Sequence, residues 1–178
     1  MDLSHHLIRS LVLALALMMF PTAAAIAGPD AATCPGDTIG AYDTTNGKFF
    51  LRNSNSGGAA DGGVFPFQQP GRVALTGDYD GDCDETPGAY DATTGKFFLR
   101  NSNSLGVADA GVFIFQQPGR IPLMGDWDGD GDDTIGAYDA TTGKFFLRNT
   151  NSAGAADAGV FIFQQPLRAP LKGDWDAL

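Results

Sequence analysis

A 48-residue repeat is the feature of this sequence that most constrains its fold. The tetrapeptide Gly-Ala-Tyr-Asp begins at positions 40, 88 and 136, and Gly-Lys-Phe-Phe-Leu-Arg-Asn begins at 47, 95 and 143. A third block, Val-Phe-x-Phe-Gln-Gln-Pro, keeps the same register from 64, 112 and 160. Self-similarity at such a period indicates a repeat architecture, in which each unit packs against its neighbours. We expect three sequence units, at about 34–81, 82–129 and 130–178.

Each unit carries four short apolar segments separated by turn-rich stretches, which is the pattern of strands rather than helices. In the third unit these segments are 134–138, 144–149, 159–164 and 168–172. The second and third are apolar at successive positions, so both of their faces must be covered, and stacked sheets achieve this. Four strands in a unit of this length are typical of a propeller blade. The predicted fold is all-β, with three four-stranded antiparallel blade-like repeats in a partial or oligomer-completed β-propeller.

The first 27 residues have the features of a secretory signal peptide. Arg9 precedes an apolar run at 11–20, and small residues follow that run. Ala25-Ile26-Ala27 matches a cleavage pattern, so we expect the mature chain to begin near Gly28, with cleavage after Ala25 as the alternative. The apolar run is short for a membrane span, and an uncleaved anchor is the other interpretation. This predicts one soluble domain, 28–178, that is secreted or lies at the cell surface, with no membrane span after cleavage.

Charge and residue content exclude several functions. The net charge is −10, and every acidic residue except Glu85 is an aspartate. Because the positive residues form no basic run, nucleic acid is not an expected partner. The only histidines, His5 and His6, lie in the predicted signal. The mature chain therefore lacks the residue needed for Ser-His-Asp catalysis, His-ligated zinc or a histidine general base, and we expect it not to be an enzyme.

Two acidic loops carry the candidate chemistry. Residues 126–133 read Asp-Trp-Asp-Gly-Asp-Gly-Asp-Asp, with acids at positions 1, 3 and 5 and glycine at 6. This spacing lets a short loop wrap oxygens around a hard cation, and Ca²⁺ accepts six to eight of them. Position 12 is Ala137 rather than glutamate, so the loop is not an EF-hand, and the acid at position 8 is the candidate closing ligand. The predicted calcium ligands are Asp126, Asp128, Asp130 and Asp133, then Asp78, Asp80, Asp82 and Glu85.

Other interpretations of these loops are solvated acidic turns or a catalytic carboxylate pair. Cys83 occupies the glycine position of the second-unit loop and would be strained if the turn needs a positive φ. In an oxidising compartment Cys34 and Cys83 are expected to form one disulfide. Two free thiols and an intermolecular pair are the alternatives.

These residues give the unit a family likeness. It resembles the FG-GAP/VCBS-type repeat of integrin α-chain propellers and of bacterial surface and secreted proteins. The likeness rests on Gly-Asp-Trp-Asp-Gly-Asp-Gly at 125–131, Asp-Thr-Ile-Gly-Ala-Tyr at 133–138, and Phe-Gln-Gln-Pro at 163–166, which resembles a degenerate Phe-Gly segment. The resemblance implies a four-stranded blade with calcium in the loop between two strands, in proteins that adhere, scaffold or bind glycans. Two features depart from the family: Thr134 and Thr86 stand where its last acid is common, and its propellers usually have about seven blades.

The two ends of the chain match complementary halves of one acidic loop. Residues 174–178 correspond to its first half and residues 34–40 to its second half. We expect Asp174 and Asp176 of one chain to meet Asp37 of another in a split calcium site, giving a six-bladed dimer ring or a head-to-tail filament. A monomeric open arc and a fragment of a longer protein are the alternatives.

Two functional classes follow from these expectations. The first is a non-enzymatic adhesion module that binds an extracellular glycan or protein, with three similar surfaces for multivalent contact. The second is a self-assembling filament or sheath subunit cross-linked by calcium. Asn-Ser-Asn-Ser at 53–56 and 101–104 offers polar groups to a sugar, or forms ordinary solvent loops.

Overall fold

The computed structural model describes residues 34–173 and Trp175. The predicted signal peptide, and Asp174 and Asp176 of the predicted split site, lie outside these residues. The described part of the chain forms eleven β-strands and no helix, and so holds no helix able to cross a membrane. The all-β prediction is confirmed.

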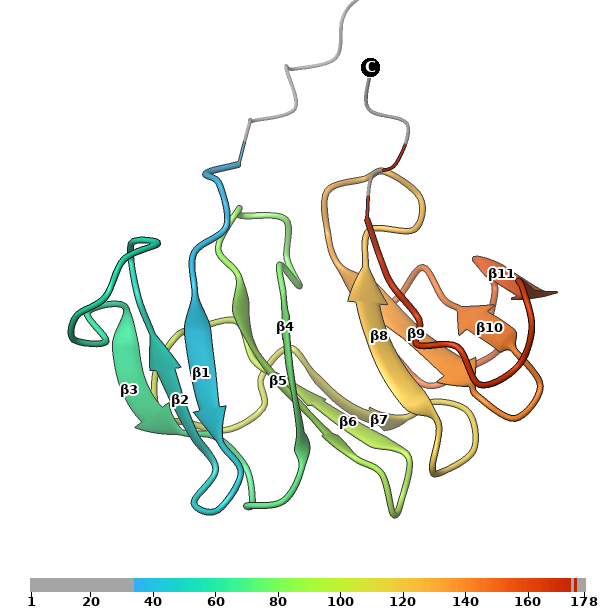
Figure 1. The fold of residues 1–178 in the computed structure, drawn as a ribbon, viewed down its shortest axis with the longest axis horizontal. Coiled ribbons are helices and arrows are strands. Elements are labelled where there is room, and N and C mark those ends of the chain that lie inside the picture. Colours follow the sequence, from blue (N-terminus) through green and yellow to red (C-terminus); the bar gives the residue numbers. More distant parts are fainter. Residues whose placement is uncertain (1–33, 174, 176–178) are drawn as a thin grey trace, which may run out of the picture. The chain divides into compact units, whose positions relative to one another are not determined.

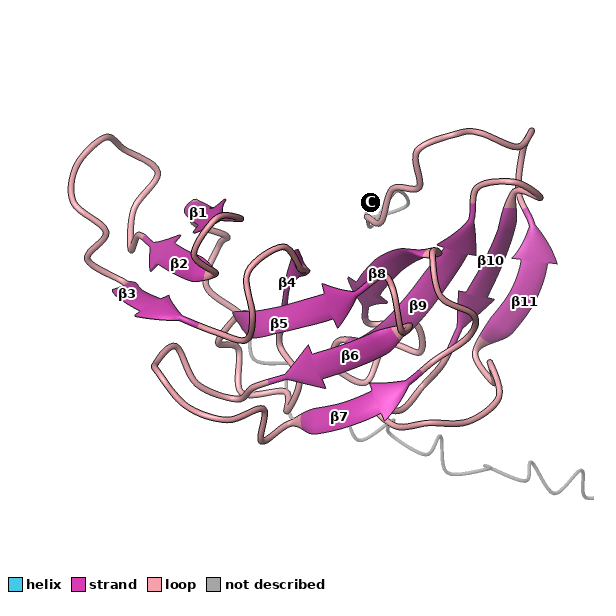
Figure 2. Cartoon of the chain, turned by 90° about the horizontal axis from the view of Figure 1, so that it is seen from below, coloured by secondary structure: helices cyan, strands magenta, loops and turns pink. Residues whose placement is uncertain are grey.

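The strands form three antiparallel sheets, and in each sheet the strands pair in chain order (Figure 1). Figure 2 shows the meander of β5, β6 and β7 in the second sheet. The first sheet contains β1 (Gly40–Asp43), β2 (Lys48–Leu51) and β3 (Gly63–Pro66). The second contains β4 (Val73–Gly77), β5 (Thr86–Asp91), β6 (Lys96–Leu99) and β7 (Gly111–Ile114). The third contains β8 (Ile121–Gly125), β9 (Thr134–Asp139), β10 (Lys144–Leu147) and β11 (Gly159–Ile162).

The sheets are offset from the sequence units. β4 is the fourth apolar segment of the first unit, yet it pairs with β5 of the second unit, with Val73 opposite Tyr90. β8 pairs with β9 in the same way, with Ile121 opposite Tyr138. Each four-stranded sheet therefore takes its first strand from the preceding unit.

This offset corrects the prediction of three four-stranded blades. The first sheet has three strands, and the predicted strand at 168–172 is not a strand. The physical reason is that this segment corresponds to β8, whose ladder partner is the first strand of the following unit. The predicted strand at 159–164 ends earlier, at Ile162, because Gln164 has a left-handed φ of 64°. The described residues form no closed barrel or propeller, and the propeller stays a prediction.

Aspartate and glycine build the turn between the second and third strands of the four-stranded sheets. In the second sheet, Oδ1 of Asp91 accepts hydrogen bonds from the backbone N (2.9 Å) and Oγ1 (2.6 Å) of Thr93. Gly95, at φ 72°, donates its N–H to the carbonyl of Asp91. This confirms the predicted hairpin with a positive-φ glycine. In the third sheet, the hydrogen bonds from Thr141 hold the pKa of Asp139 at about 2.

Aromatic rows fill the space between successive sheets. In the second sheet the ring of Phe97 lies 4.8 Å from Tyr90 and 5.9 Å from Phe113. This row packs against buried Ile135 and Ala137 of the third sheet. The first sheet packs on the second through Phe49, Phe65, Phe67 and Ala89. The predicted stacking of sheet on sheet is therefore confirmed.

An arginine holds the long loop that follows β2, β6 and β10. Arg100 donates to the carbonyls of Ser104 (2.9 Å), Val107 (2.6 Å) and Leu105 (3.3 Å), and its Nη1 lies 3.3 Å from Oδ2 of Asp109. Arg52 and Arg148 make the corresponding bonds. These loops are therefore closed around a guanidinium group.

Replacing Arg100 with methionine keeps its apolar stem but removes three charge-assisted hydrogen bonds to loop carbonyls. We expect this change to lower the free energy of unfolding by about 2 kcal/mol or more. Urea unfolding followed by tryptophan fluorescence measures it. Asp109→Asn is the control, because it removes only a half-exposed ion pair and should cost under about 1 kcal/mol. Equal losses would show that the ion pair, rather than the carbonyl bonds, holds the loop.

Candidate metal centre

The two acidic loops are the hairpin connections between the first two strands of the second and third sheets. The loop at 78–85 joins β4 to β5, and the loop at 126–133 joins β8 to β9. A threonine closes the base of each loop: Thr86 Oγ1 donates to the carbonyl of Gly77 (3.1 Å), and Thr134 Oγ1 to that of Gly125 (3.4 Å). The threonines at position 9 therefore fasten the hairpin. They stand at the position where the FG-GAP/VCBS-type repeat commonly carries an acid.

The first carboxylate of each loop organises the backbone around itself. Asp78 accepts hydrogen bonds from the N–H groups of Gly81 (2.8 Å), Asp82 (3.2 Å) and Cys83 (2.8 Å). Asp126 accepts the matching bonds from Gly129, Asp130 and Gly131, at 2.7, 3.2 and 3.1 Å. Because these bonds curl the loop around one carboxylate, they fix where the following side chains lie.

The structure brings the first three predicted ligands of each loop together. Each of Asp126, Asp128 and Asp130 offers a carboxylate oxygen, and these oxygens lie within 4.8 Å of one another. Asp78, Asp80 and Asp82 form the same group in the second sheet. Three converging carboxylates match the hard-oxygen ligands that Ca²⁺ prefers.

The pKa of the central aspartate is raised in both loops, in part by its neighbouring carboxylates. The pKa of Asp80 is raised by burial and then by the charges of Asp82 and Asp78. The pKa of Asp128 is raised by burial and then by the charge of Asp130. Negative charge is therefore disfavoured at the central carboxylate of each loop, and a bound divalent cation would reverse this.

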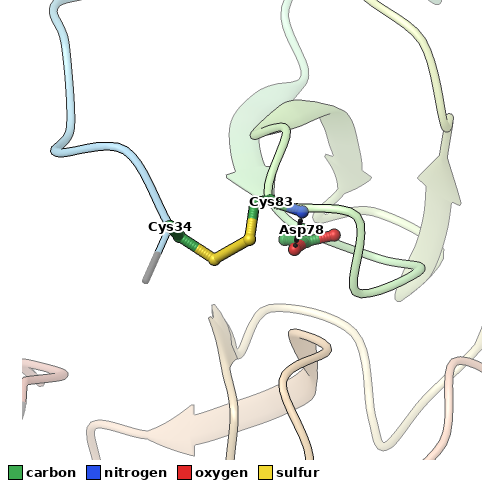
Figure 3. Close-up of side chains that lie close together, drawn as sticks. All are labelled: Cys34, Asp78 and Cys83. Atoms are coloured by element: carbon green, nitrogen blue, oxygen red, sulfur yellow. Dashed lines mark hydrogen bonds between the residues drawn. A yellow bond between two sulfur atoms is a disulfide. The ribbon is translucent and has the colours of Figure 1, made fainter. Parts of the chain in front are cut away.

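The sixth position of both loops has a left-handed backbone, at φ 104° for Gly131 and 73° for Cys83. The strain foreseen for Cys83 is thus present. Cys83 forms a disulfide with Cys34 across a Cα–Cα distance of 5.1 Å, beside Asp78 (Figure 3). The bond fastens the segment that precedes β1 to the loop of the second sheet. Because both sulfurs are in the disulfide, they are not thiolate ligands for a metal.

The acids at position 8 do not join the ligand groups of their own loops. Asp133 is buried, its backbone N–H donates to the carbonyl of Asp78, and its carboxylate lies 3.2 Å from Nζ of Lys172. Glu85, Asp133 and the equivalent Asp37 instead line one small hollow together with Lys172. The pKa of Glu85 is raised there by burial and then by the charge of Asp133. These acids lie between loops, so each loop brings together three carboxylates rather than four.

Sequence reasoning missed Lys172 at this hollow. The signal was present, because Thr76 and Met124 occupy the equivalent positions of the other units and only the third unit carries a charge. A departure from an otherwise regular repeat marks a position with a separate role.

The Asn-Ser loops are engaged within the fold. Nδ2 of Asn103 donates to the carbonyl of Glu85 at 2.9 Å, and Asn55 and Asn151 make the same bond to Asp37 and Asp133. Ser102 and Ser104 form a hydroxyl pair at 3.2 Å. These contacts favour a structural role for the loops over a sugar-binding role.

Removing the first carboxylate should have unequal effects in the two loops. Asp78 is buried, and Asp78→Ala leaves the backbone N–H groups that it binds without their acceptor. We therefore expect the free energy of unfolding to fall by about 2 kcal/mol in metal-free experiments. Asp126 is exposed, so water can replace its bonds and Asp126→Ala should cost less. Asp78→Asn keeps one acceptor oxygen and should recover part of the loss. Small and equal effects at both sites would contradict the organising role of this carboxylate.

No protein-family model matches the chain, and searches of curated proteins and of solved structures return no match.

Proposed function

We propose that this protein is a secreted, calcium-binding, non-enzymatic adhesion module of FG-GAP/VCBS-type repeats that binds an extracellular glycan or protein. One observation carries the calcium assignment. Three carboxylates converge on a preordered loop, at the same hairpin of two successive sheets. A fold that needed only solvated turns would gain nothing from gathering repelling acids twice at the same place.

The partners of the other acids support a non-enzymatic role. Asp91 and Asp139 are held in hairpin turns by threonine hydrogen bonds, which lower the pKa of both carboxyl groups. Asp109 and Asp157 bond the backbone N–H of the Asn-Ser loops and pair with arginine. A general acid or base needs a pKa closer to neutrality and access to a reacting group. These carboxylates are used to build turns and loops instead.

The second candidate function is a self-assembling extracellular structural subunit. The observation that favours it is the pair of exposed sheet faces at the two ends of the described chain, one on the first sheet and one on the third.

Thermal unfolding with millimolar calcium, and again with a chelator, tests the metal assignment. A ligand bound only by the folded state must raise the melting temperature. We expect a rise of roughly 5–10 °C per site when calcium is about a hundredfold above its dissociation constant. Magnesium should give a much smaller rise, because it demands a tighter octahedron and keeps its waters.

A double variant, Asp80→Asn with Asp128→Asn, serves as the control. It removes one ligand charge per loop but leaves the organising carboxylates Asp78 and Asp126 in place. Its melting temperature in chelator should equal or exceed that of the wild type, because repulsion is relieved, and calcium should no longer raise it. An unchanged melting temperature for the wild type in calcium would refute the calcium sites. If the sites hold, retention on immobilised extracellular polysaccharides with and without calcium tests the adhesion role.

A further inference from the structure

The first sheet lacks one strand that the other two sheets have. In the second and third sheets, the outer edge of β5 or β9 is covered by β4 or β8. In the first sheet, β1 corresponds to these strands but pairs only with β2 among the described residues. The chain also contains a segment that matches the missing strand, because 168–173 corresponds to 120–125 and forms no strand. We call residues 168–175 the tail.

An uncovered sheet face lies next to the tail. Phe161 of β11 is 46% exposed, whereas the equivalent Phe65 and Phe113 are 5% and 9% exposed. Phe163 is 62% exposed, and its equivalents Phe67 and Phe115 are each 1% exposed. These residues are buried wherever another sheet follows. The outer face of the third sheet is therefore one half of an interface that the chain forms twice internally.

The first sheet presents the other half of that interface. Ile39 is 54% exposed, while the equivalent Ile135 is fully buried. Ala41 is exposed, while the equivalent Ala89 and Ala137 are buried against the preceding sheet. The exposed faces of the first and third sheets are thus complementary, because the chain packs the same two surfaces together at both of its internal interfaces.

Two side chains of the tail have no counterpart to contact. Arg72 and Arg120 each lie with the guanidinium carbon 3.9 Å from the ring centre of Phe98 or Phe146 in their own sheets. The next arginine in this series is Arg168, and the phenylalanine without an arginine is Phe50 of the first sheet. A cation over an aromatic face is favourable, and here the two partners lie at opposite ends of the repeat.

The tryptophan of the acidic loop likewise has partners in the third sheet that, among the described residues, the tryptophan of the tail lacks. Trp127 packs against Gly125 and Gly136, and its Nε1 donates to the carbonyl of Ile135 at 3.3 Å. Trp175 packs against Gly173 and is 77% exposed. Gly40, the first-sheet equivalent of Gly136, instead lines a cleft of about 710 Å³.

We propose that the tail of one copy of this chain adds to the first sheet of a second copy, antiparallel to β1. The register of β8 on β9 places Ala169 opposite Tyr42, Leu171 opposite Gly40, and Gly173 opposite Thr38 of the second copy. Arg168 then covers Phe50, Trp175 enters the cleft at Gly40, and the outer face of the third sheet packs on the first sheet of the second copy. Exposed strand edges recruit partners in this way.

Sheet number favours a second copy over closure within one chain. Lys172 pairs with Asp133 of its own chain and lines the same hollow as Asp37, so its charge fits either arrangement. Propellers typically need at least four sheets to close, and the described residues form three. Two copies that exchange tails supply six four-stranded sheets. This joint, the pairing of the tail of one copy with β1 of a second copy, does not depend on the calcium sites.

The hydrogen bonds of β1 show which backbone N–H groups of the tail would bond to it. The N–H of Arg52 donates to the carbonyl of Ile39, so Ile39 faces β2 and Gly40, one residue later, faces the open edge. Leu171 would therefore bond to Gly40 through its N–H, whereas Pro170 lies opposite Ala41 and needs no N–H. Leu171 is exposed and outside any strand, so Leu171→Pro should block the joint without disturbing the fold of the single chain.

The test is molar mass in solution, measured by sedimentation across micromolar concentrations on protein secreted from the full-length gene. The wild type should show twice the single-chain mass and approach the single-chain mass on dilution. Leu171→Pro should stay at the single-chain mass, and Pro170→Ala should match the wild type. Gly40→Val, which fills the receiving cleft, should also stay single. An equal mixture of Leu171→Pro and Gly40→Val should recover twice the mass, because one variant offers an intact β1 and the other an intact tail.

Two results would overturn the proposal. One is a wild type that keeps the single-chain mass at every concentration. If Leu171→Pro also lowers the melting temperature of that single chain, the tail pairs within its own chain. The other is a Leu171→Pro variant that keeps the wild-type mass.

Discussion

The pairing of each unit's last apolar segment with the first strand of the next unit is the interaction on which the rest of this structure depends. It joins β4 to β5 and β8 to β9, so the chain between them becomes a hairpin loop inside a sheet. Because that loop starts and ends on neighbouring strands, its alternating acids are drawn into one group around the first carboxylate. The candidate metal centre is thus a product of the offset between sequence unit and sheet.

The same offset determines what happens at the ends. An offset repeat leaves one sheet short of its first strand and one strand without a sheet. This offset explains three features: the exposed aromatic residues of the third sheet, the open edge of β1 and the exposed Trp175. The disulfide between Cys34 and Cys83 fastens the segment before β1 to the loop of the second sheet. It therefore holds the open edge in place next to the hollow that contains Asp37 and Lys172.

Features within one unit could be predicted from the sequence, and so could the stacking of sheets and the disulfide, but the pairing of strands from different units could not. Period and apolar runs predict the strands, and an aspartate followed by glycine predicts the hairpins, because both depend on local backbone preferences. The first three acids of each loop lie close together for the same reason. The segment at 168–172 matches 120–124 at its arginine, proline and leucine, but a strand needs a ladder partner, and no local pattern tells which unit supplies it. The position of Asp133 depends on contacts with Asp78 and Lys172, which are far away in sequence, so its place outside the carboxylate group could not be predicted locally.

Amide hydrogen exchange of the tail, followed as the protein is concentrated, tests the offset pairing most directly. The account predicts that 121–125 is protected at every concentration, because β8 is paired within the chain. The amides of Leu171 and Gly173 should exchange as freely as unstructured chain in dilute solution, and should slow as the protein associates. Free exchange throughout 121–125, or a tail already protected at the highest dilution, would contradict it.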